Sequence, residues 1–226
     1  MATASKRLTR KDLRQPDWFQ VTSESALEFI QTHKPAVLAA AGALVVIVAV
    51  LWGWQLFKAS QDSAASQQFA EALALYQSAK YREAVAAFEN VQKYRWSRYA
   101  VPAHLYVAHA YLATKETDKA TSAAQRSLTA TRPNTLYRQI ALFALASAEE
   151  QSKRCQTAVE HYDQASRINA ALQAHAALGK ARCAEELGDF KTALATYQAY
   201  VKENPGSPFA LKLAELEAKI SSQPAK

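Results

Sequence analysis

LGDFKTALATYQAYVKENP, residues 187–205, contains the pattern that decides the fold of this 226-residue chain. Ala193 follows Phe190 by three positions and precedes Tyr197 by four. The same arrangement, an alanine between two aromatic or small residues, occurs four times, as Tyr81-Ala84-Phe88, Thr117-Ala120-Ala124, Cys155-Ala158-Tyr162 and Phe190-Ala193-Tyr197. The four alanines are 36, 38 and 35 residues apart. Recurrence at such a period indicates stacked supersecondary units.

A small residue also lies in the segment before each copy, at Ala72, Ala108, Ala146 and Ala181. Alanine lets two antiparallel helices approach closely, and an aromatic side chain fills the space between neighbouring units. With Gly188 before it and Pro205 after it, the last copy resembles the second helix of the tetratricopeptide repeat, whose period is about 34 residues. The resemblance covers residues 64–206. It implies close packing through Ala84, Phe88, Ala120, Ala158, Tyr162, Gly188, Ala193 and Tyr197.

The fold class that follows is an all-α solenoid of about four helical hairpins over residues 58–221. Five glycines and seven prolines in the whole chain, with many Ala, Leu, Gln, Lys and Glu, favour helix almost throughout and no sheet. Trp96, Arg132 and Ala170 replace the usual terminal proline, and Pro102 is expected in the first turn of its helix. Apolar residues between Ser207 and Ser221 recur at near-helical spacing, which predicts a capping helix before a tail, 222–226.

The segment AVLAAAGALVVIVAVLWGWQLF, residues 36–57, carries no charge. As an α-helix it would be about 33 Å long, enough to cross a hydrocarbon core of about 30 Å. Trp52 and Trp54 lie near its end, where indole rings favour the headgroup layer. A buried core helix would carry more polar residues, and a signal peptide would be followed by a small-residue cleavage site instead of Lys58. The sequence therefore predicts a transmembrane helix.

Basic residues are concentrated before this segment, at Lys6, Arg7, Arg10, Lys11, Arg14 and Lys34. After Lys58 no further basic residue occurs until Lys80. The positive-inside rule then predicts a cytoplasmic N-terminus and a periplasmic C-terminal domain. Residues 1–35 are expected to form a basic cytoplasmic head with a short amphipathic helix, Ala26–His33, that either rests on lipid or contacts a membrane partner. The head up to Leu13-Arg14-Gln15-Pro16-Asp17 resembles those of bacterial membrane-anchored tetratricopeptide proteins.

No pattern of catalytic or ligand-binding residues stands out. The glycines are isolated, so no phosphate-binding loop is expected. His104 and His109 are five residues apart on one predicted helix and point to different faces, which argues against a metal pair. The chain has a net charge of +7, but the basic residues beyond the membrane segment are interspersed with acidic ones and form no stripe for nucleic acid. We expect no enzyme, no metal or cofactor, and no small-molecule substrate.

The two cysteines belong to adjacent predicted helices of neighbouring repeats. Cys155 begins the second helix of the third repeat, and Cys183 lies near the end of the next repeat's first helix. In an oxidising periplasm they could form a disulfide, and otherwise they are two small buried hydrophobic residues. Both interpretations stay open at this stage.

Tetratricopeptide stacks bind extended peptides or partner helices on the concave surface that the first helices line. Transferring the family's groove positions to this chain gives Phe69, Leu73, Tyr76, Leu105, His109, Leu112, Phe143, Ser147, Leu178, Arg182 and Glu185. Family members that capture chaperone C-terminal carboxylates carry Lys and Asn at such positions, which these residues do not supply. The groove is expected to be apolar and aromatic, suited to hydrophobic peptide segments or a partner helix, and some of its side chains could belong to the core between repeats.

The order of parts, together with Tyr99-Ala100-Val101-Pro102-Ala103 and the turn Leu187-Gly188-Asp189-Phe190, resembles the ancillary SecYEG translocon subunit family, also called YfgM-like. That resemblance implies a single-pass protein-interaction scaffold of the cytoplasmic membrane. Its partners would be Sec translocon subunits, a membrane-anchored chaperone or exported chains. The run from Tyr197 to Ala210 is similar to periplasmic repeat proteins of cell division and outer-membrane assembly, which is one alternative. A receptor on an organelle surface with cytosolic repeats is another.

Overall fold

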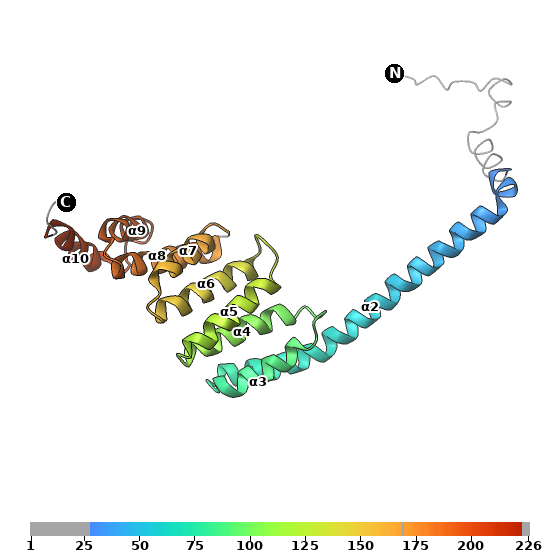
Figure 1. Cartoon of the computed structure of the whole chain (residues 1–226), viewed down its shortest axis with the longest axis horizontal. Coiled ribbons are helices and arrows are strands. Elements are labelled where there is room, and N and C mark those ends of the chain that lie inside the picture. The colour runs from blue at the N-terminus through green and yellow to red at the C-terminus, as the bar shows by residue number, and fades with distance from the viewer. Residues whose placement is uncertain (1–27, 169, 223–226) are drawn as a thin grey trace, which may run out of the picture. The chain divides into compact units, whose positions relative to one another are not determined.

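The computed structural model describes residues 28–168 and 170–222, and every regular element in them is a helix (Figure 1). The predicted absence of a sheet is confirmed for that part of the chain. The basic head up to residue 27 and the tail from residue 223 lie outside the described residues. Of the predicted short helix Ala26–His33, residues 28–32 are helical and His33 lies in a turn. The chain divides into two compact units, residues 1–57 and 58–226.

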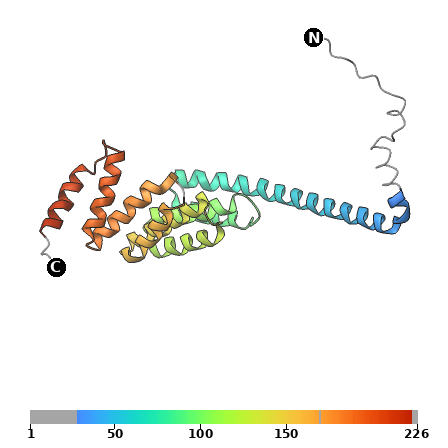
Figure 2. The same cartoon turned by 90° about the horizontal axis from the view of Figure 1, so that it is seen from above.

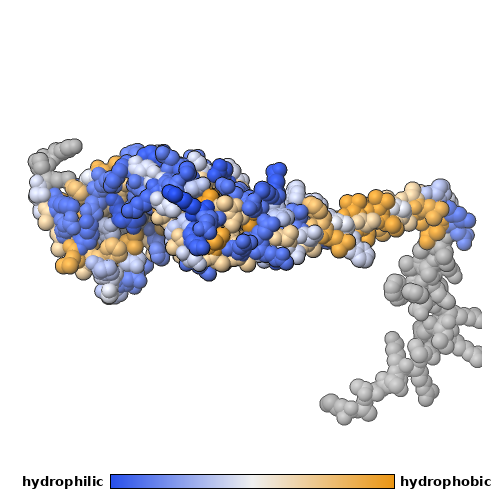
Figure 3. All heavy atoms as spheres, turned by 90° about the horizontal axis from the view of Figure 1, so that it is seen from below, coloured by the Kyte–Doolittle hydropathy of each residue, from blue (hydrophilic) through white to orange (hydrophobic). Residues whose placement is uncertain are grey.

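Helix α2 (Lys34–Gln77) contains both the uncharged segment 36–57 and the first helix of the first repeat. It is long and apolar enough to cross a membrane, and its apolar window is not buried. Figure 3 shows apolar surface along this helix. Its exposed large apolar side chains are Leu38, Leu44, Val45, Val46, Ile47, Val48, Val50, Leu51, Trp52, Trp54, Leu56 and Phe57. A helix buried in a protein core would not expose such a set of side chains.

Helical hairpins follow one another along the rest of the chain, which confirms the predicted α-solenoid. The second helices begin at the first residue of each sequence motif: α3 (Tyr81–Gln92), α5 (Thr117–Ala130), α7 (Cys155–Ser166) and α9 (Phe190–Glu203). The first helices after α2 are α4 (Ala100–Ala113), α6 (Leu136–Gln151) and α8 (Gln173–Glu186), the last preceded by the short 3-10 helix η2 (Ala170–Leu172). From α3 onward, each α-helix packs against its neighbours in the chain (Figure 2).

The alanines of the sequence pattern lie where the helices meet. Ala84, Ala120, Ala158 and Ala193 of the second helices are fully buried, as are Ala72, Ala108, Ala146 and Ala181 of the first helices. Helix α4 also contacts α6, and α6 contacts α8. The first helices therefore form one continuous surface, as in a solenoid.

The turn from first to second helix is the same in all four hairpins. Each turn contains one residue with positive φ, namely Ala79 (58°), Lys115 (59°), Lys153 (62°) and Gly188 (81°). In the second hairpin, the Lys115 N–H donates to the Leu112 carbonyl at 3.1 Å, and the Glu116 N–H donates to the Tyr111 carbonyl at 3.0 Å. Equivalent bonds occur in the other three turns. This is the Schellman motif, in which a left-handed residue ends a helix.

Two further expectations concern prolines and the C-terminal helix. Pro102 is the third residue of α4 and so lies in its first turn, as predicted. The capping helix is α10 (Ala210–Ser221), which begins three residues later than predicted. It buries Leu216 in a cluster with Leu178 and Tyr197, and Phe209 just before it stacks on Tyr197. The last repeat is thereby covered by α10.

Candidate functional site

A hollow of about 530 Å³ lies on the surface formed by the first helices. We call it the aromatic groove. Helix α2 supplies two of its lining residues, α4 supplies four and the start of α6 supplies two. They are Phe69, Tyr76, Pro102, Leu105, Tyr106, His109, Tyr137 and Ile140. Apart from the His109 ring and the tyrosine hydroxyls, the lining side chains are apolar. The groove is thus suited to apolar side chains of a partner.

Aromatic contacts fix the groove at its α2 end. The ring of Tyr106 stacks on Phe88 with centroids 4.9 Å apart. Phe69 meets Phe88 at 5.4 Å and Tyr106 at 5.7 Å, both edge to face. Tyr76 packs edge-on against Tyr106 at 5.2 Å. Such pairs stabilise beyond their buried area, by about 0.5–1.5 kcal/mol each. The groove wall is therefore set by packing in the first two repeats.

Burial keeps the groove uncharged. It lowers the pKa of His109 below its ordinary value, and it raises the pKa of Tyr76, with smaller contributions from Tyr81 and Tyr106. His104, on the same helix, also has a lowered pKa because of burial and the nearby Arg126. Near neutral pH, His109 is neutral and Tyr76 keeps its proton. The groove accordingly offers hydrogen-bonding groups without a formal charge.

Four of the predicted groove residues line this hollow: Phe69, Tyr76, Leu105 and His109. Leu73 and Leu112 instead pack against the core cluster of the first repeats. The groove residues that sequence reasoning missed are Pro102, Tyr106, Tyr137 and Ile140. Tyr137 and Ile140 are three residues apart and so share a face of α6, a spacing visible in the sequence. They lie before Phe143 and Ser147, the α6 positions that were transferred from the family pattern.

Three other predicted groove residues meet in a polar cluster between α6, α7 and α8, which we call the Glu150 cluster. Arg182 donates two hydrogen bonds to the Glu150 carboxylate, at 2.6 and 2.8 Å. The Tyr162 hydroxyl donates to the same carboxylate at 2.5 Å and lies 3.1 Å from the Ser147 hydroxyl. Phe143 packs edge-on against the Tyr162 ring at 5.6 Å. The cluster joins the third repeat to the fourth.

The protonation state of Tyr162 is set by this environment. Burial, and then the hydrogen bond to Glu150, raise the pKa of Tyr162 well above its ordinary value. The hydroxyl therefore stays protonated and keeps donating to Glu150. Charge-assisted hydrogen bonds of this kind stabilise more than neutral ones.

The remaining two predicted groove residues serve the C-terminal cap. Leu178 is buried against Ala181, Tyr197 and Leu216, so it belongs to the core and not to an open groove. Glu185 pairs with Lys212 of α10 at 2.6 Å and with Lys219 at 3.3 Å. Because α10 occupies this end of the stack, both residues hold the cap.

Cys155 and Cys183 are joined by a disulfide, with Cα atoms 5.0 Å apart. Both residues are buried, and the bond links α7 to α8 within the cluster that includes Leu142, Ala146 and Tyr162. The third and fourth repeats are thus connected both covalently and through the Glu150 cluster.

Comparison with known families agrees with this geometry. A family model described as "Tetratricopeptide repeat" matches residues 69–135 and 143–208. The chain belongs to the tetratricopeptide-repeat family. Tetratricopeptide repeats are protein-interaction modules and generally not enzymes, so this chain is a protein-interaction scaffold.

The fold of this tetratricopeptide protein is also found in a solved structure from Podosopora anserina, the nearly identical TPR-like repeats of a putative kinesin light chain. The two chains are 19% identical, with a TM-score of 0.58. The match covers 72% of this chain and 89% of the other. At this identity the likeness concerns the fold. A comparison with curated proteins finds no match.

Proposed function

We propose that this tetratricopeptide protein is a single-pass scaffold of the bacterial cytoplasmic membrane that assists protein export at the Sec translocon. The proposed membrane tether rests on one observation, the uncharged segment 36–57, whose large apolar side chains are exposed along α2. Exposed apolar surface of this extent is stable in a lipid bilayer and unfavourable in water.

The proposed orientation has a cytoplasmic N-terminus and a periplasmic repeat domain. Support comes from the six basic residues that precede the segment, against Lys58 alone on the other side until Lys80. The disulfide between Cys155 and Cys183 gives independent support, because disulfides persist in oxidising compartments and are rare in the cytosol.

The proposed partners are proteins with exposed apolar segments. The aromatic groove carries no formal charge near neutral pH and no lysine or asparagine to clamp a carboxylate. An unfolded exported chain, or an apolar helix of a translocon subunit or chaperone, presents side chains of the matching kind. The order of parts resembles that of the ancillary SecYEG translocon subunit family. We propose the Sec channel as the place of action because of this resemblance.

The tether and its orientation can be tested in spheroplasts of a bacterial host that expresses the full chain with a C-terminal tag. Added protease should remove the tag without lysis, while the protein stays in the membrane after an alkaline carbonate wash. A tag protected until lysis would contradict the periplasmic orientation. Extraction by carbonate would contradict the tether.

A further inference from the structure

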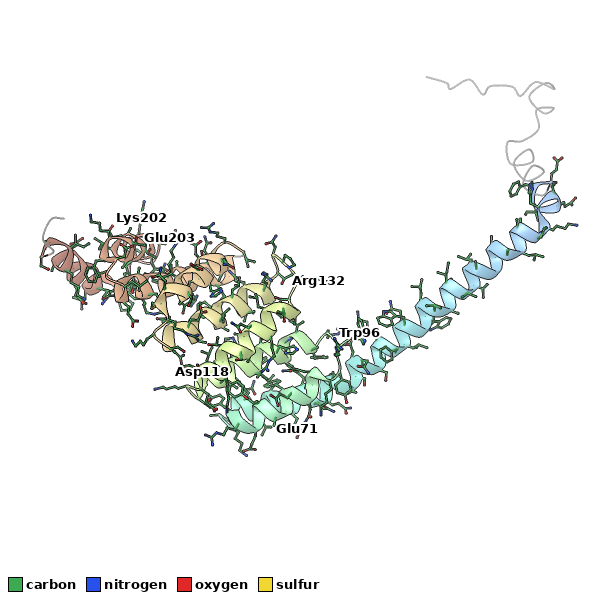
Figure 4. The ribbon with its side chains drawn as sticks, viewed as in Figure 1. Glu71, Trp96, Asp118, Arg132, Lys202 and Glu203 are labelled. Carbon is green, nitrogen blue, oxygen red and sulfur yellow. A yellow bond between two sulfur atoms is a disulfide. The ribbon has the colours of Figure 1, made fainter. Side chains whose placement is uncertain are left out.

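The connection between α3 and α4, Lys93-Tyr94-Arg95-Trp96-Ser97-Arg98-Tyr99, alternates basic and aromatic residues. We call it the 93–99 loop. The Ser97 N–H donates to the Tyr94 carbonyl at 2.9 Å, which closes a turn with Arg95 and Trp96 at its tip. Trp96 is 58% exposed, and Lys93 and Arg95 are exposed beside it. Figure 4 shows Trp96 on this connection, at the opposite end of the helices from Asp118 of α5.

The two tyrosines of the loop face inward. Tyr94 accepts a hydrogen bond from the Gln68 side chain at 3.0 Å, and the Tyr99 ring packs on Phe69 with centroids 5.3 Å apart. Ser97 is buried. With these inward contacts on both sides of the tip, Arg95 and Trp96 stay exposed.

Asp62 of α2 fixes the position of the loop. Its carboxylate accepts hydrogen bonds from the Arg98 backbone N–H at 2.8 Å and from Arg98 Nε at 3.2 Å. The backbone bond from Arg98 is the main cause of the lowered pKa of Asp62, with the Ser97 hydroxyl contributing next. Among the described residues, Arg98 is in an ion pair, whereas Lys93 and Arg95 are not. Lys93 donates a hydrogen bond to the Asn90 side-chain oxygen at 2.7 Å, which leaves its positive charge without an ion-pair partner among these residues.

Chain length limits how far the loop can lie from the apolar segment. Asp62 is five residues after Phe57, the last residue of that segment, and five residues span at most about 18 Å. The loop is hydrogen-bonded to Asp62 itself. A bilayer surface at the end of segment 36–57 would thus lie within about 18 Å of Asp62, the residue to which the loop is attached.

We propose that the 93–99 loop docks on anionic phospholipid headgroups at the membrane surface, an inference that rests on the proposed membrane tether. The exposed indole of Trp96 suits the boundary between headgroups and acyl chains, where tryptophan is enriched. Lys93 and Arg95 suit the phosphate groups, and each positive charge near an anionic surface contributes about a 5-fold gain in binding. Docking fixes the first repeat, and so the α2 end of the aromatic groove, next to the membrane.

The test uses the full chain with Trp18, Trp52 and Trp54 replaced by phenylalanine, so that Trp96 is its only tryptophan. The protein is reconstituted into vesicles of phosphatidylcholine, with or without phosphatidylglycerol, whose acyl chains are brominated. With phosphatidylglycerol, Trp96 emission should shift to shorter wavelength and be quenched by bromine. Added salt should reverse both effects, because the attraction is screened.

Charge reversal by Lys93→Glu with Arg95→Glu should reduce the quenching to the level seen in phosphatidylcholine alone. The matched control is Arg82→Glu, an exposed arginine in the first turn of α3 at the other end of the same repeat. It should leave the quenching unchanged. Far-UV circular dichroism of all variants checks that the repeats stay folded.

Flotation of the vesicles after an alkaline wash separates the two proposals. Protein that fails to float contradicts the tether, and the docking proposal falls with it. Protein that floats while Trp96 stays unquenched, or is quenched equally in both lipid mixtures, overturns the docking proposal alone. Shielding of Trp96 only after a protein partner is added would also overturn it.

Discussion

Glycine is needed at two positions of the repeat domain, for a different reason at each. Gly188 ends the first helix of the last repeat with a positive φ of 81°, where a side chain would be strained. Gly179 lies within α8, where the helix passes close to a buried aromatic ring. A Cβ at Gly179 would lie 2.5 Å from Cζ of Tyr162 and 2.6 Å from its Cε1. Hydrogen bonds to Glu150 and Ser147 hold that ring in place.

Three ring atoms would lie within 2.8 Å of the new Cβ, so the overpacking cost should be near the upper end of the usual 1–3 kcal/mol range, about 2–3 kcal/mol. The better helix propensity of alanine returns about 1 kcal/mol, so we expect Gly179→Ala to lower the free energy of unfolding by about 1–2 kcal/mol. Thermal unfolding in detergent, followed by circular dichroism, measures the change. Gly206→Ala is the control, because no heavy atom lies within 4 Å of a Cβ there. A Gly179→Ala protein as stable as the wild type would contradict the close approach.

In the Schellman turns, a substitution to glycine should instead stabilise the protein. Lys115 occupies the same turn position as Gly188 but has a side chain in the left-handed region, where L-residues lose about 1–2 kcal/mol. We expect Lys115→Gly to raise the free energy of unfolding by roughly 0.5–1 kcal/mol, after the greater unfolded-state entropy of glycine is subtracted. Denaturant unfolding measures it, with Gly188→Ala as the comparison that should destabilise. Lower stability of Lys115→Gly would contradict the strain at this turn position.

Residues of the helix contacts were easier to locate from the sequence than those of the turns. The alanine motif predicted the starts of α3, α5, α7 and α9, because small residues at a fixed period mark the places where helices approach closely. The close approach at Gly179 could not be predicted, since its partner Tyr162 is 17 residues away and an isolated glycine carries no signal of a neighbour. Two of the turns, at Lys115 and Lys153, have lysine at the left-handed position, where glycine would have indicated the end of the helix.

At the scale of elements, α7 and α8 are joined by a covalent bond, the disulfide between Cys155 and Cys183. Replacing both Cys155 and Cys183 by alanine should lower the free energy of unfolding by about 3–4 kcal/mol, by the chain-entropy model for residues 28 apart. Unfolding with and without reductant measures this, and reductant should have no effect on the double variant. Denatured, unreduced protein should show no free thiol. Two free thiols would contradict the bond.

Tyr137 of α6 and Leu178 of α8 lie in different environments, although both belong to first helices of repeats. Tyr137 of α6 lines the aromatic groove and is 45% exposed, whereas Leu178 of α8 is 8% exposed under α10. We expect Tyr137→Ala to weaken partner capture while changing the free energy of unfolding by about 0.5 kcal/mol or less. Leu178→Ala should lose about 2–5 kcal/mol. Pull-down yield measures partner capture by both variants, and thermal unfolding measures their stability. Equal losses of stability would contradict the assignment of Tyr137 to the groove and Leu178 to the core.

The groove on α6 shows why family positions transferred from sequence were only partly sufficient. Phe69, Tyr76, Leu105 and His109 were placed in the groove by that transfer, and they line it. On α6 and α8 the same transfer indicated Phe143, Arg182 and Glu185, which instead pack on Tyr162 or form ion pairs with Glu150 and Lys212. The partners of these side chains lie on other helices, and such contacts are not visible in one sequence.

For the whole molecule, we propose that one uncharged helical segment tethers a tetratricopeptide scaffold whose uncharged groove binds apolar segments of proteins in export. The repeat fold and its role in protein interaction rest on the family match to residues 69–135 and 143–208. The tether, the periplasmic orientation and the Sec partners are proposals. Charge bias and an apolar run predict a span from sequence alone, whereas the identity of a partner depends on surfaces of other proteins.

The most direct test of the central claim is photocrosslinking in intact bacterial cells from the aromatic groove. Benzoylphenylalanine would replace Tyr137 in the groove or, as a control, Asp118, an exposed residue of α5 at the other end of the helices (Figure 4). Mass spectrometry would identify the adducts. We expect Sec channel subunits, a membrane-anchored chaperone or exported chains from position 137, and none of these from position 118. Adducts with division or outer-membrane assembly proteins, or the same adducts from both positions, would contradict the proposed role in export.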